Sequence, residues 1–164
     1  MNYDEQIHLH NARNGKCILY YDNGEMKYNG NRVNGKKNGE GVYYHDNGKK
    51  MYEGGFQNDM WCGNGTKYDR DEQIEYNGNW SDGKRNGEGT SYDENGNTMY
   101  KGNYQDDQAH GQGISFHFNG KIQYNGSWSK GQRHGTGTLY NDQGDILFMD
   151  QEWVNGELAD IENQ

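Results

Sequence analysis

The sequence predicts an all-β protein built as a single-layer antiparallel meander of consecutive β-hairpins. The main observation is a period of 24 residues, in which a tyrosine is followed by glycine two residues later and an aromatic residue four residues later, as in Tyr52, Gly54 and Phe56. A fixed period of about 20 to 50 residues is typical of arrays that stack one supersecondary unit. The composition agrees, because 26 glycines and no proline among 164 residues favour many tight turns between short strands.

Each copy of the repeat predicts two strands. Counting the recurrent tyrosine as offset 0, glycine returns at offsets 11 and 13 in five copies, and β-forming residues follow at offsets 14 and 16. The next strand carries a mostly apolar residue at offset 22, then tyrosine, glycine and the aromatic residue at offsets 0, 2 and 4. One face of this strand is therefore aromatic, and the other is polar. We interpret the glycine at offset 2 as room for a neighbouring ring to lie against bare backbone.

Two kinds of connection are expected between about 11 to 13 strands. A longer loop at offsets 5 to 10 joins the strands within a copy. Asn-Gly-type turns, such as Asn47-Gly48, join successive copies as type I′ turns, because both residues accept positive φ angles. The copies divide the chain into a degenerate repeat or cap (1–27), five tandem repeats (28–147), and a partial repeat with a cap (148–164). In that last cap, Leu158 and Ile161 are expected to turn inward.

Charge and cysteine usage restrict the partners and the compartment. The formal net charge is −9, so nucleic acid is not expected as a partner, because long-range repulsion opposes its binding. Cys17 and Cys62 lie far apart without the spacing of a metal site or a disulfide framework, which favours a reducing compartment. No apolar stretch has the length of a secretion signal or a membrane span. These observations predict a cytoplasmic protein.

Catalytic and metal-binding chemistry find little support in the sequence. Asp22-Asn-Gly and Asp46-Asn-Gly faintly resemble calcium loops, but the spacing of an EF-hand is absent and turns explain the same residues. His110 and His134 share a repeat offset that Asn and Cys also occupy, which is typical of a turn position. A nucleophile would need an oriented base and an oxyanion hole, which a single-layer sheet does not offer. We therefore predict no enzyme activity, no cofactor and no metal.

One stretch of the chain resembles a known repeat closely. Tyr76-Asn-Gly-Asn-Trp80-Ser-Asp-Gly83-Lys-Arg-Asn-Gly87-Glu-Gly89-Thr90 resembles the MORN repeat (membrane occupation and recognition nexus), and Tyr124 to Thr138 matches as well. The resemblance covers five full copies and partial copies at both ends. It implies strings of β-hairpins that form an elongated, twisted sheet with a groove. In the enzymes of this family, the chemistry belongs to a separate domain, so the resemblance implies a non-catalytic protein here.

The aromatic columns are the predicted partner-binding face. We expect a scaffold that binds a protein partner, such as an amphipathic helix, or a second copy of itself, along an aromatic groove. The rings are also expected to pack against one another across strands. A carbohydrate-binding repeat protein is a further alternative, because sugars stack on exposed rings. The candidate residues are Tyr28, Tyr44, Tyr52, Phe56, Tyr68, Tyr76, Trp80, Tyr92, Tyr100, Tyr104, Phe116, Tyr124, Trp128 and Tyr140.

Alternate copies differ in the loop that follows the aromatic face. Copies one, three and five carry basic residues there, while copies two and four carry Asp59 and Asp107 at offset 7, which gives a superperiod of 48 residues. The basic loops suggest an alternative function, peripheral binding to anionic lipid headgroups, although solvated loops account for the same charges. The candidate residues are Lys36, Lys37, Lys84, Arg85 and Arg133.

Overall fold

The structure, a computed structural model, describes residues 12–159, and all regular secondary structure in this range is β-strand. The strands follow the predicted repeat at two per copy. They are β1 (Gly15–Tyr20), β2 (Met26–Val33), β3 (Lys36–Tyr44), β4 (Lys50–Gln57), β5 (Met60–Tyr68), β6 (Ile74–Ser81), β7 (Lys84–Tyr92), β8 (Thr98–Gln105), β9 (Gln108–Phe116), β10 (Ile122–Ser129), β11 (Gln132–Tyr140), β12 (Ile146–Val154) and β13 (Glu157–Leu158).

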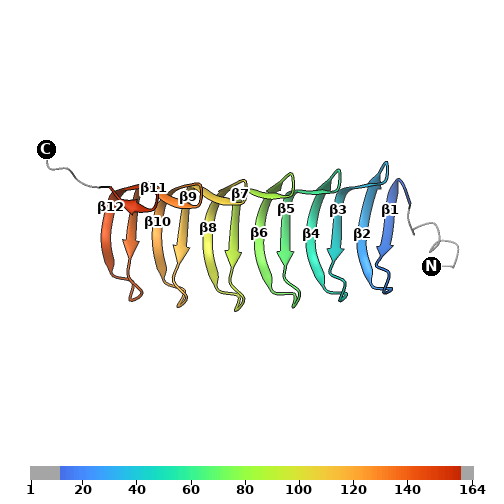
Figure 1. Ribbon diagram of the computed structural model, residues 1–164, viewed down its shortest axis with the longest axis horizontal. Helices are drawn as coiled ribbons and strands as arrows, with labels where there is room; N and C mark the ends of the chain where they lie inside the picture. Colours follow the sequence, from blue (N-terminus) through green and yellow to red (C-terminus); the bar gives the residue numbers. More distant parts are fainter. Residues whose placement is uncertain (1–11, 160–164) are drawn as a thin grey trace. The chain divides into compact units, whose positions relative to one another are not determined.

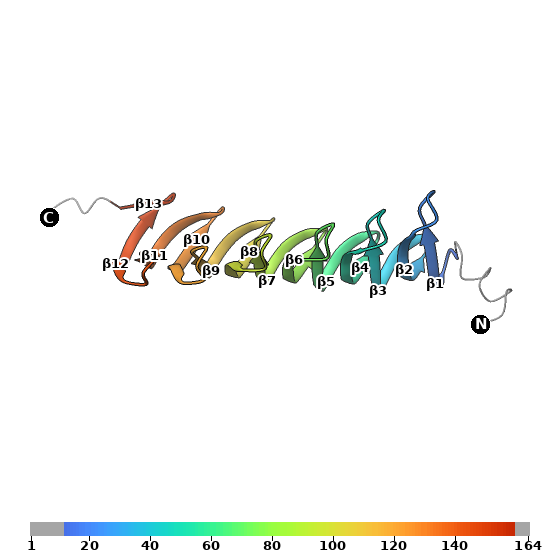
Figure 2. The same ribbon diagram turned by 90° about the horizontal axis from the view of Figure 1, so that it is seen from below.

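The sheet is a meander in which 13 strands follow one another in chain order. The chain forms two compact units, Met1–Lys84 (unit 1) and Arg85–Gln164 (unit 2), and each is described by itself. Within each unit, consecutive hairpins lie side by side and neighbouring strands pair antiparallel (Figure 1). Over residues 12–159, Figure 2 shows no second layer of strands or helices on either unit. The predicted single-layer antiparallel meander is confirmed.

The recurrent tyrosine packs against paired glycines. Gly30 lies opposite Gly41 in the β2–β3 ladder, and a Cβ atom added to Gly41 would lie 2.7 Å from the hydroxyl oxygen of Tyr28. A Cβ atom on Gly30, the glycine at offset 2, would clash with the same hydroxyl, so this glycine leaves room for a ring as predicted, but the ring is that of Tyr28 in the same strand and not a neighbouring one. Each hydroxyl donates a hydrogen bond to the carbonyl at offset 3. These bonds are Tyr28 to Asn31 (2.9 Å), Tyr52 to Gly55 (3.2 Å), Tyr76 to Asn79 (3.1 Å), Tyr100 to Asn103 (3.0 Å) and Tyr124 to Ser127 (3.2 Å).

The opposite face of β2, β4, β6, β8 and β10 is exposed at offset 1, as the alternation predicts, while its offset 3 positions are half-buried or, at Gly55, buried. The residues at offset 1, between the buried tyrosine and the glycine, are exposed in all five full copies. This alternation is what a sheet with one packed face and one wet face requires. The exposed residues are Asn29, Glu53, Asn77, Lys101 and Asn125.

The connection within a copy is a two-residue turn, and the longer loop predicted at offsets 5 to 10 is wrong. Asn34 and Gly35 join β2 to β3 with φ angles of 52° and 83°, and Asn58 and Asp59 join β4 to β5 with 51° and 74°. Positive φ at both central residues is the signature of a type I′ turn, whose twist matches that of the flanking strands. The residues expected in a basic loop are consequently the first residues of β3, β7 and β11.

The Asn-Gly turns between copies are not type I′ turns, which corrects the second turn prediction. Between β3 and β4, the Gly48 N–H donates to the His45 carbonyl at 3.1 Å, and Gly48 has a φ of 82° while Asn47 stays at negative φ. This is a type I turn followed by a left-handed glycine. The Asn47 side chain accepts from the Lys49 N–H (3.1 Å) and donates to the Arg70 carbonyl of the next copy (2.9 Å). Asparagine is therefore used here for its amide group, because it links successive turns.

The two ends of the described chain continue the same pattern. Cys17 on β1 is 1% exposed and lies opposite Gly30 of β2. At the other end, Leu158 on β13 lies opposite the buried Trp153 and is half-buried. Ile161, the second residue expected to turn inward, lies outside the described residues.

Candidate functional site

The rings at offsets 0 and 4 form the core of each unit rather than a free surface. Tyr28, Tyr52 and Tyr124 are 0% exposed, and Trp80 is 5% exposed. The rings meet edge to face, an arrangement that aromatic quadrupoles favour. The centroid distances are Tyr28–Phe56 5.3 Å, Tyr52–Phe56 5.2 Å, Tyr52–Trp80 5.6 Å and Tyr76–Trp80 5.0 Å in unit 1, and Tyr100–Tyr104 5.1 Å, Tyr100–Trp128 5.2 Å, Tyr124–Trp128 5.2 Å and Tyr124–Trp153 5.6 Å in unit 2.

The residue directly opposite the recurrent tyrosine is at offset 15, next to the aromatic column at offset 16. Tyr43 lies opposite Tyr28 and Tyr52, whereas Ser91 lies opposite Tyr100. The register then shifts by a β-bulge, so that the candidate rings at offset 16 lie opposite offset 22 of the following strand. The rings affected are half-buried: Tyr44, Tyr68, Tyr92, Phe116 and Tyr140.

The candidate basic residues are held by neighbouring copies. The Lys37 ammonium lies 3.5 Å from the Asp59 carboxylate, and the Arg85 guanidinium lies 3.3 Å from that of Asp107. Arg133 donates to the Gly156 carbonyl at 3.0 Å and lies over the Trp153 ring at 4.2 Å. Lys36 and Lys84, the first residues of β3 and β7, are exposed. The predicted anion-binding side chains of Lys37, Arg85 and Arg133 are therefore engaged within the protein.

These contacts explain the 48-residue superperiod. The Asp59 N–H donates to the Lys37 carbonyl (3.1 Å), while the Asp59 carboxylate accepts from the Lys37 N–H (2.9 Å). Asp107 makes the same two bonds to Arg85, at 3.1 and 2.9 Å. Partial burial raises the pKa of Asp59, but these hydrogen bonds and the Lys37 charge outweigh it, so that the pKa is lowered. A basic residue in one copy is thus matched by aspartate in the next.

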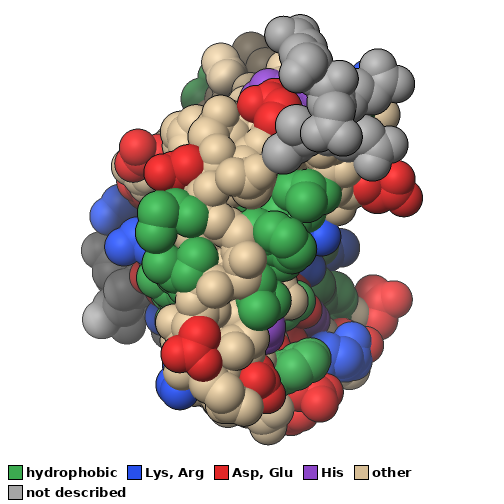
Figure 3. Space-filling model, turned by 90° about the vertical axis from the view of Figure 1, so that its left-hand side faces the viewer, with side chains coloured by type: hydrophobic (Ala, Val, Ile, Leu, Met, Phe, Trp, Pro, Cys, Tyr) green, Lys and Arg blue, Asp and Glu red, His purple; other side chains and the backbone are tan. Residues whose placement is uncertain are grey.

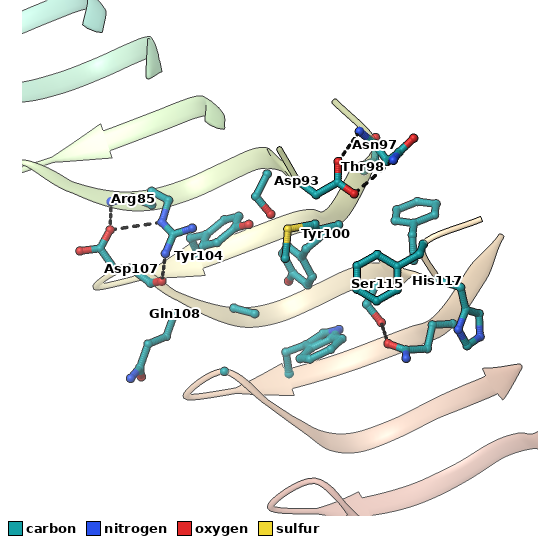
Figure 4. A pocket seen from close by; sticks show the side chains of 18 residues that line it. Arg85, Asp93, Asn97, Thr98, Tyr100, Tyr104, Asp107, Gln108, Ser115 and His117 are labelled. Carbon is teal, nitrogen blue, oxygen red and sulfur yellow. Dashed lines mark hydrogen bonds and ion pairs between the residues drawn. The ribbon is translucent and has the colours of Figure 1, made fainter. Parts of the chain in front are cut away.

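Unit 2 contains a cavity of about 460 Å³ on its aromatic face (Figure 4). It lies between β7, β8, β9 and β10, and four of the predicted partner-binding rings line it: Tyr100, Tyr104, Phe116 and Trp128. The candidate basic residue Arg85 lines it as well. Its volume lies within the range of about 300 to 1,000 Å³ typical of ligand sites. We call it the unit 2 cavity.

The rim of the unit 2 cavity combines exposed apolar and acidic groups. Phe118 is 90% exposed and Met99 is 50% exposed. The pKa of Asp93 lies below its ordinary value because the Asn97 side chain and backbone N–H groups donate hydrogen bonds to its carboxylate. Burial raises the pKa of Tyr100 and of Tyr104, so both rings stay neutral at physiological pH. The cavity therefore offers neutral aromatic walls with a carboxylate at the edge.

The equivalent part of unit 1 is partly occupied by Trp61, which is not among the predicted partner-binding residues. Trp61 stacks on Tyr52 with a centroid distance of 4.4 Å and an angle of 6°, and meets Trp80 edge to face at 4.9 Å. Trp61 and Tyr43 line a second cavity, of about 360 Å³, together with Lys37 and Asp59. The signal that could have identified Trp61 is the column at offset 9, where it replaces the basic or small residue of the other copies.

A cluster of exposed apolar side chains lies on β12. Ile146, Leu147, Phe148 and Met149 are 47%, 52%, 42% and 57% exposed. Figure 3 looks onto this side of unit 2, where hydrophobic side chains gather. β12 pairs with β13 through Trp153 and Val154. The cluster is named the β12 patch.

Residues 12–159 offer no group of three or more His, Cys, Asp or Glu side chains that could hold a metal ion. In the same range, no helix is long and apolar enough to cross a membrane. Both described cysteines have free thiols, and burial raises the pKa of Cys17 and of Cys62.

The repeated hairpin, the tyrosine on paired glycines and the stacked turns define a class, a repeat protein with a surface for interactions. The model of the MORN repeat family matches residues 28–50, 52–73, 76–98, 100–121 and 124–146, and a MORN repeat variant matches 13–34. The chain belongs to the MORN repeat family. MORN repeats are generally interaction or membrane-associated modules, and proteins made of them are generally non-catalytic. No curated protein matches the chain significantly.

Proposed function

We propose that this protein is a non-catalytic scaffold that binds a protein partner on its aromatic face, with the unit 2 cavity as the main contact. The observation that carries the proposal is a cavity of about 460 Å³ whose rim leaves Phe118 90% exposed. Large apolar side chains that gather at a concave site mark interaction surfaces in soluble proteins. The buried rings beneath supply a rigid floor, so little conformational entropy is lost when a partner binds.

Charge favours a basic partner segment. Unit 2 contains five Lys or Arg and twelve Asp or Glu, a formal net charge of −7, against eleven and thirteen in unit 1, a net charge of −2. An acidic unit attracts cationic segments and repels anionic surfaces. Anionic lipid headgroups are a weaker candidate because the net negative charge repels them. In addition, the side chains of Lys37, Arg85 and Arg133 already have partners within the protein.

The test uses side chains of the rim that do not support the core. The double variant Met99→Ser, Phe118→Ser is compared with the wild type in pull-downs from the native host, followed by binding of each purified partner. We expect loss of the specific partner with unchanged circular dichroism. Val33→Ser is the matched control, because Val33 is 51% exposed and does not line the cavity. Partners retained by the double variant, or lost equally in the control, would contradict the proposal.

A second function, self-association, is favoured by the β12 patch. Four consecutive apolar residues, Ile146 to Met149, are each more than 40% exposed, which is unusual for a surface strand of a monomer. We infer that a second copy covers this patch. Light scattering of the wild type and of Leu147→Lys, Met149→Lys tests the inference: a dimer that becomes a monomer supports it, and a monomeric wild type at high concentration rejects it.

The proposed site of action is the cytoplasm. Cys17 and Cys62 carry free thiols, and a reducing compartment preserves such thiols. Localisation of the tagged protein in its host tests this assignment, and recovery from the culture medium or the cell envelope would contradict it.

A further inference from the structure

Unit 1 contains an internal example of how the aromatic face holds a ring. Trp61 on β5 lies opposite Phe56 of β4, stacks on Tyr52 at 4.4 Å and meets Trp80 at 4.9 Å. Its indole is thus received by one parallel ring and one perpendicular ring. Both contacts are geometries that aromatic pairs favour.

Unit 2 has the two rings that would contact an indole, a site that we call the seat, but it has no tryptophan between them. The residues 48 positions later are Tyr100 and Trp128, which meet edge to face at 5.2 Å, much as Tyr52 and Trp80 do at 5.6 Å. The register is also the same, because Ala109 lies opposite Tyr104 as Trp61 lies opposite Phe56. Ala109 replaces the indole by a methyl group, and it lines the unit 2 cavity together with Tyr100 and Trp128.

A second substitution widens the same space. Tyr43 lies opposite Tyr52 in unit 1, whereas Ser91 lies opposite Tyr100 in unit 2, and both residues line their respective cavities. Two large rings of unit 1 are therefore small side chains in unit 2. Trp61 stacks on Tyr52 in unit 1, and Tyr100, the counterpart of Tyr52, lines the unit 2 cavity.

We propose that the unit 2 cavity binds the tryptophan side chain of a protein partner, with the indole stacked on Tyr100 and its edge against Trp128, as Trp61 is held in unit 1. This inference rests on the proposed function and specifies the group that is recognised. Charge at the rim and on unit 2 bears on the residues that flank the tryptophan, since Asp107 is paired with Arg85 and Asp93 is the further carboxylate in the lining. Asp93 and the net charge of −7 on unit 2 favour lysine or arginine on either side of it.

The direct test is a titration with two capped peptides, acetyl-Lys-Trp-Lys-amide and acetyl-Lys-Ala-Lys-amide, followed by nuclear magnetic resonance. We expect saturable shifts of the Trp128 indole N–H and the Ala109 amide with the tryptophan peptide. The alanine peptide and a Glu-Trp-Glu peptide are each expected to bind at least about tenfold more weakly, since one loses the ring and the other meets like charge.

Variants of the chain test the internal comparison. Ala109→Trp fills the seat and is expected to weaken binding of the tryptophan peptide by at least about tenfold. Ser91→Tyr introduces the ring that Tyr43 provides in unit 1, so it narrows the cavity and should also weaken binding. It serves as the second test if Ala109→Trp does not fold. Trp61→Ala is expected to create a second binding site, reported by the Trp80 indole N–H.

Equal affinity for the tryptophan and alanine peptides, or equal binding by the wild type and Ser91→Tyr, would overturn the inference. Its failure is distinct from failure of the proposed function. If the variant Met99→Ser, Phe118→Ser loses its protein partner but the tryptophan peptide does not bind to the wild type, the proposed binding surface stands and the indole site is rejected. If the variant retains that partner, both the proposed binding surface and the indole site are rejected.

Discussion

Units 1 and 2 share one scaffold and differ in what fills it. Residues 48 positions apart occupy the same places in the strands: Tyr52 and Tyr100 both lie on paired glycines, and Asp59 and Asp107 both bind the preceding copy through two hydrogen bonds. On the aromatic face the units diverge, because Trp61 corresponds to Ala109. The repeat columns therefore determine the backbone, while the residues between them determine how far rings occupy the aromatic face.

The charge of the two units differs in the same direction. Unit 1, with its filled face, has a formal net charge of −2, and unit 2, with the open cavity, has −7. Mutual repulsion of surface carboxylates opposes the compact state and is tolerated where it serves association. The cavity and the larger negative charge therefore lie in the same unit, which is the combination that the proposed cationic partner would need.

A methyl group added to the glycine beneath the recurrent tyrosine should lower the free energy of unfolding equally in both units. A Cβ atom on Gly65 or Gly113 would lie well under 3.0 Å from the Tyr52 or Tyr100 hydroxyl, respectively. Because each ring is enclosed by the sheet, we expect Gly65→Ala and Gly113→Ala to reduce the free energy of unfolding by about 3 kcal/mol each. Urea denaturation measures this. Gly83→Asn is the control, since Gly83 has open space and asparagine tolerates its φ of 78°. A large difference between the two glycine variants would show that the scaffolds are not equivalent.

The stability of the aromatic face of unit 1 should depend on Trp61. Trp61→Ala removes a ring stacked on Tyr52 and in contact with Trp80, so we expect the free energy of unfolding to fall by about 2 kcal/mol, below the cost of a fully buried tryptophan because Trp61 is only half-buried. Trp61→Phe, which keeps an aromatic ring, is expected to recover about half of the loss. Denaturant unfolding followed by tryptophan fluorescence and circular dichroism gives both values. A neutral effect would mean that the ring stabilises nothing and that the two faces differ in shape alone.

The protein should gain stability when an indole is introduced into the unit 2 cavity. Ala109→Trp places an indole next to Tyr100 and Trp128 in a cavity of about 460 Å³, so overpacking is not expected. The favourable ring contacts should raise the free energy of unfolding by about 1 kcal/mol. Thermal unfolding of this variant, with Ala109→Ser as the control that adds no ring, tests the gain. Destabilisation by the indole would mean that the seat in unit 2 has a different shape from that in unit 1.

The sequence predicted the strands and the wet face well because these depend on columns that every copy repeats. Tyr28 with Gly30 identifies the packed face, and Asn29 identifies the exposed face, in a single strand. The turn types were predicted wrongly because they depend on backbone φ angles that the residue types alone do not determine: Asn58 and Asp59 adopt positive φ without glycine, whereas Asn47, although followed by Gly48, stays at negative φ. The ion pair of Lys37 with Asp59 depends on how successive turns stack, and the cavity beside Ala109 depends on bulges that set the register.

The smallest expected effect concerns the aspartate that links successive turns, which should act alike in both units. Asp59→Asn keeps the turn conformation but removes the charge facing Lys37, so we expect a loss of about 0.5 kcal/mol at neutral pH, modest because the pair is partly exposed to solvent. The pKa of Asp59 is lowered in the folded state, so the stabilisation by its charge is present above its ordinary pKa and disappears as the pH falls through the folded value. The difference between wild type and variant in urea denaturation should therefore vanish in strong acid and shrink in high salt. Asp107→Asn, which removes the charge facing Arg85, should cost a similar amount at neutral pH. A difference between wild type and Asp59→Asn that persists unchanged in acid would assign the effect to turn geometry instead of charge.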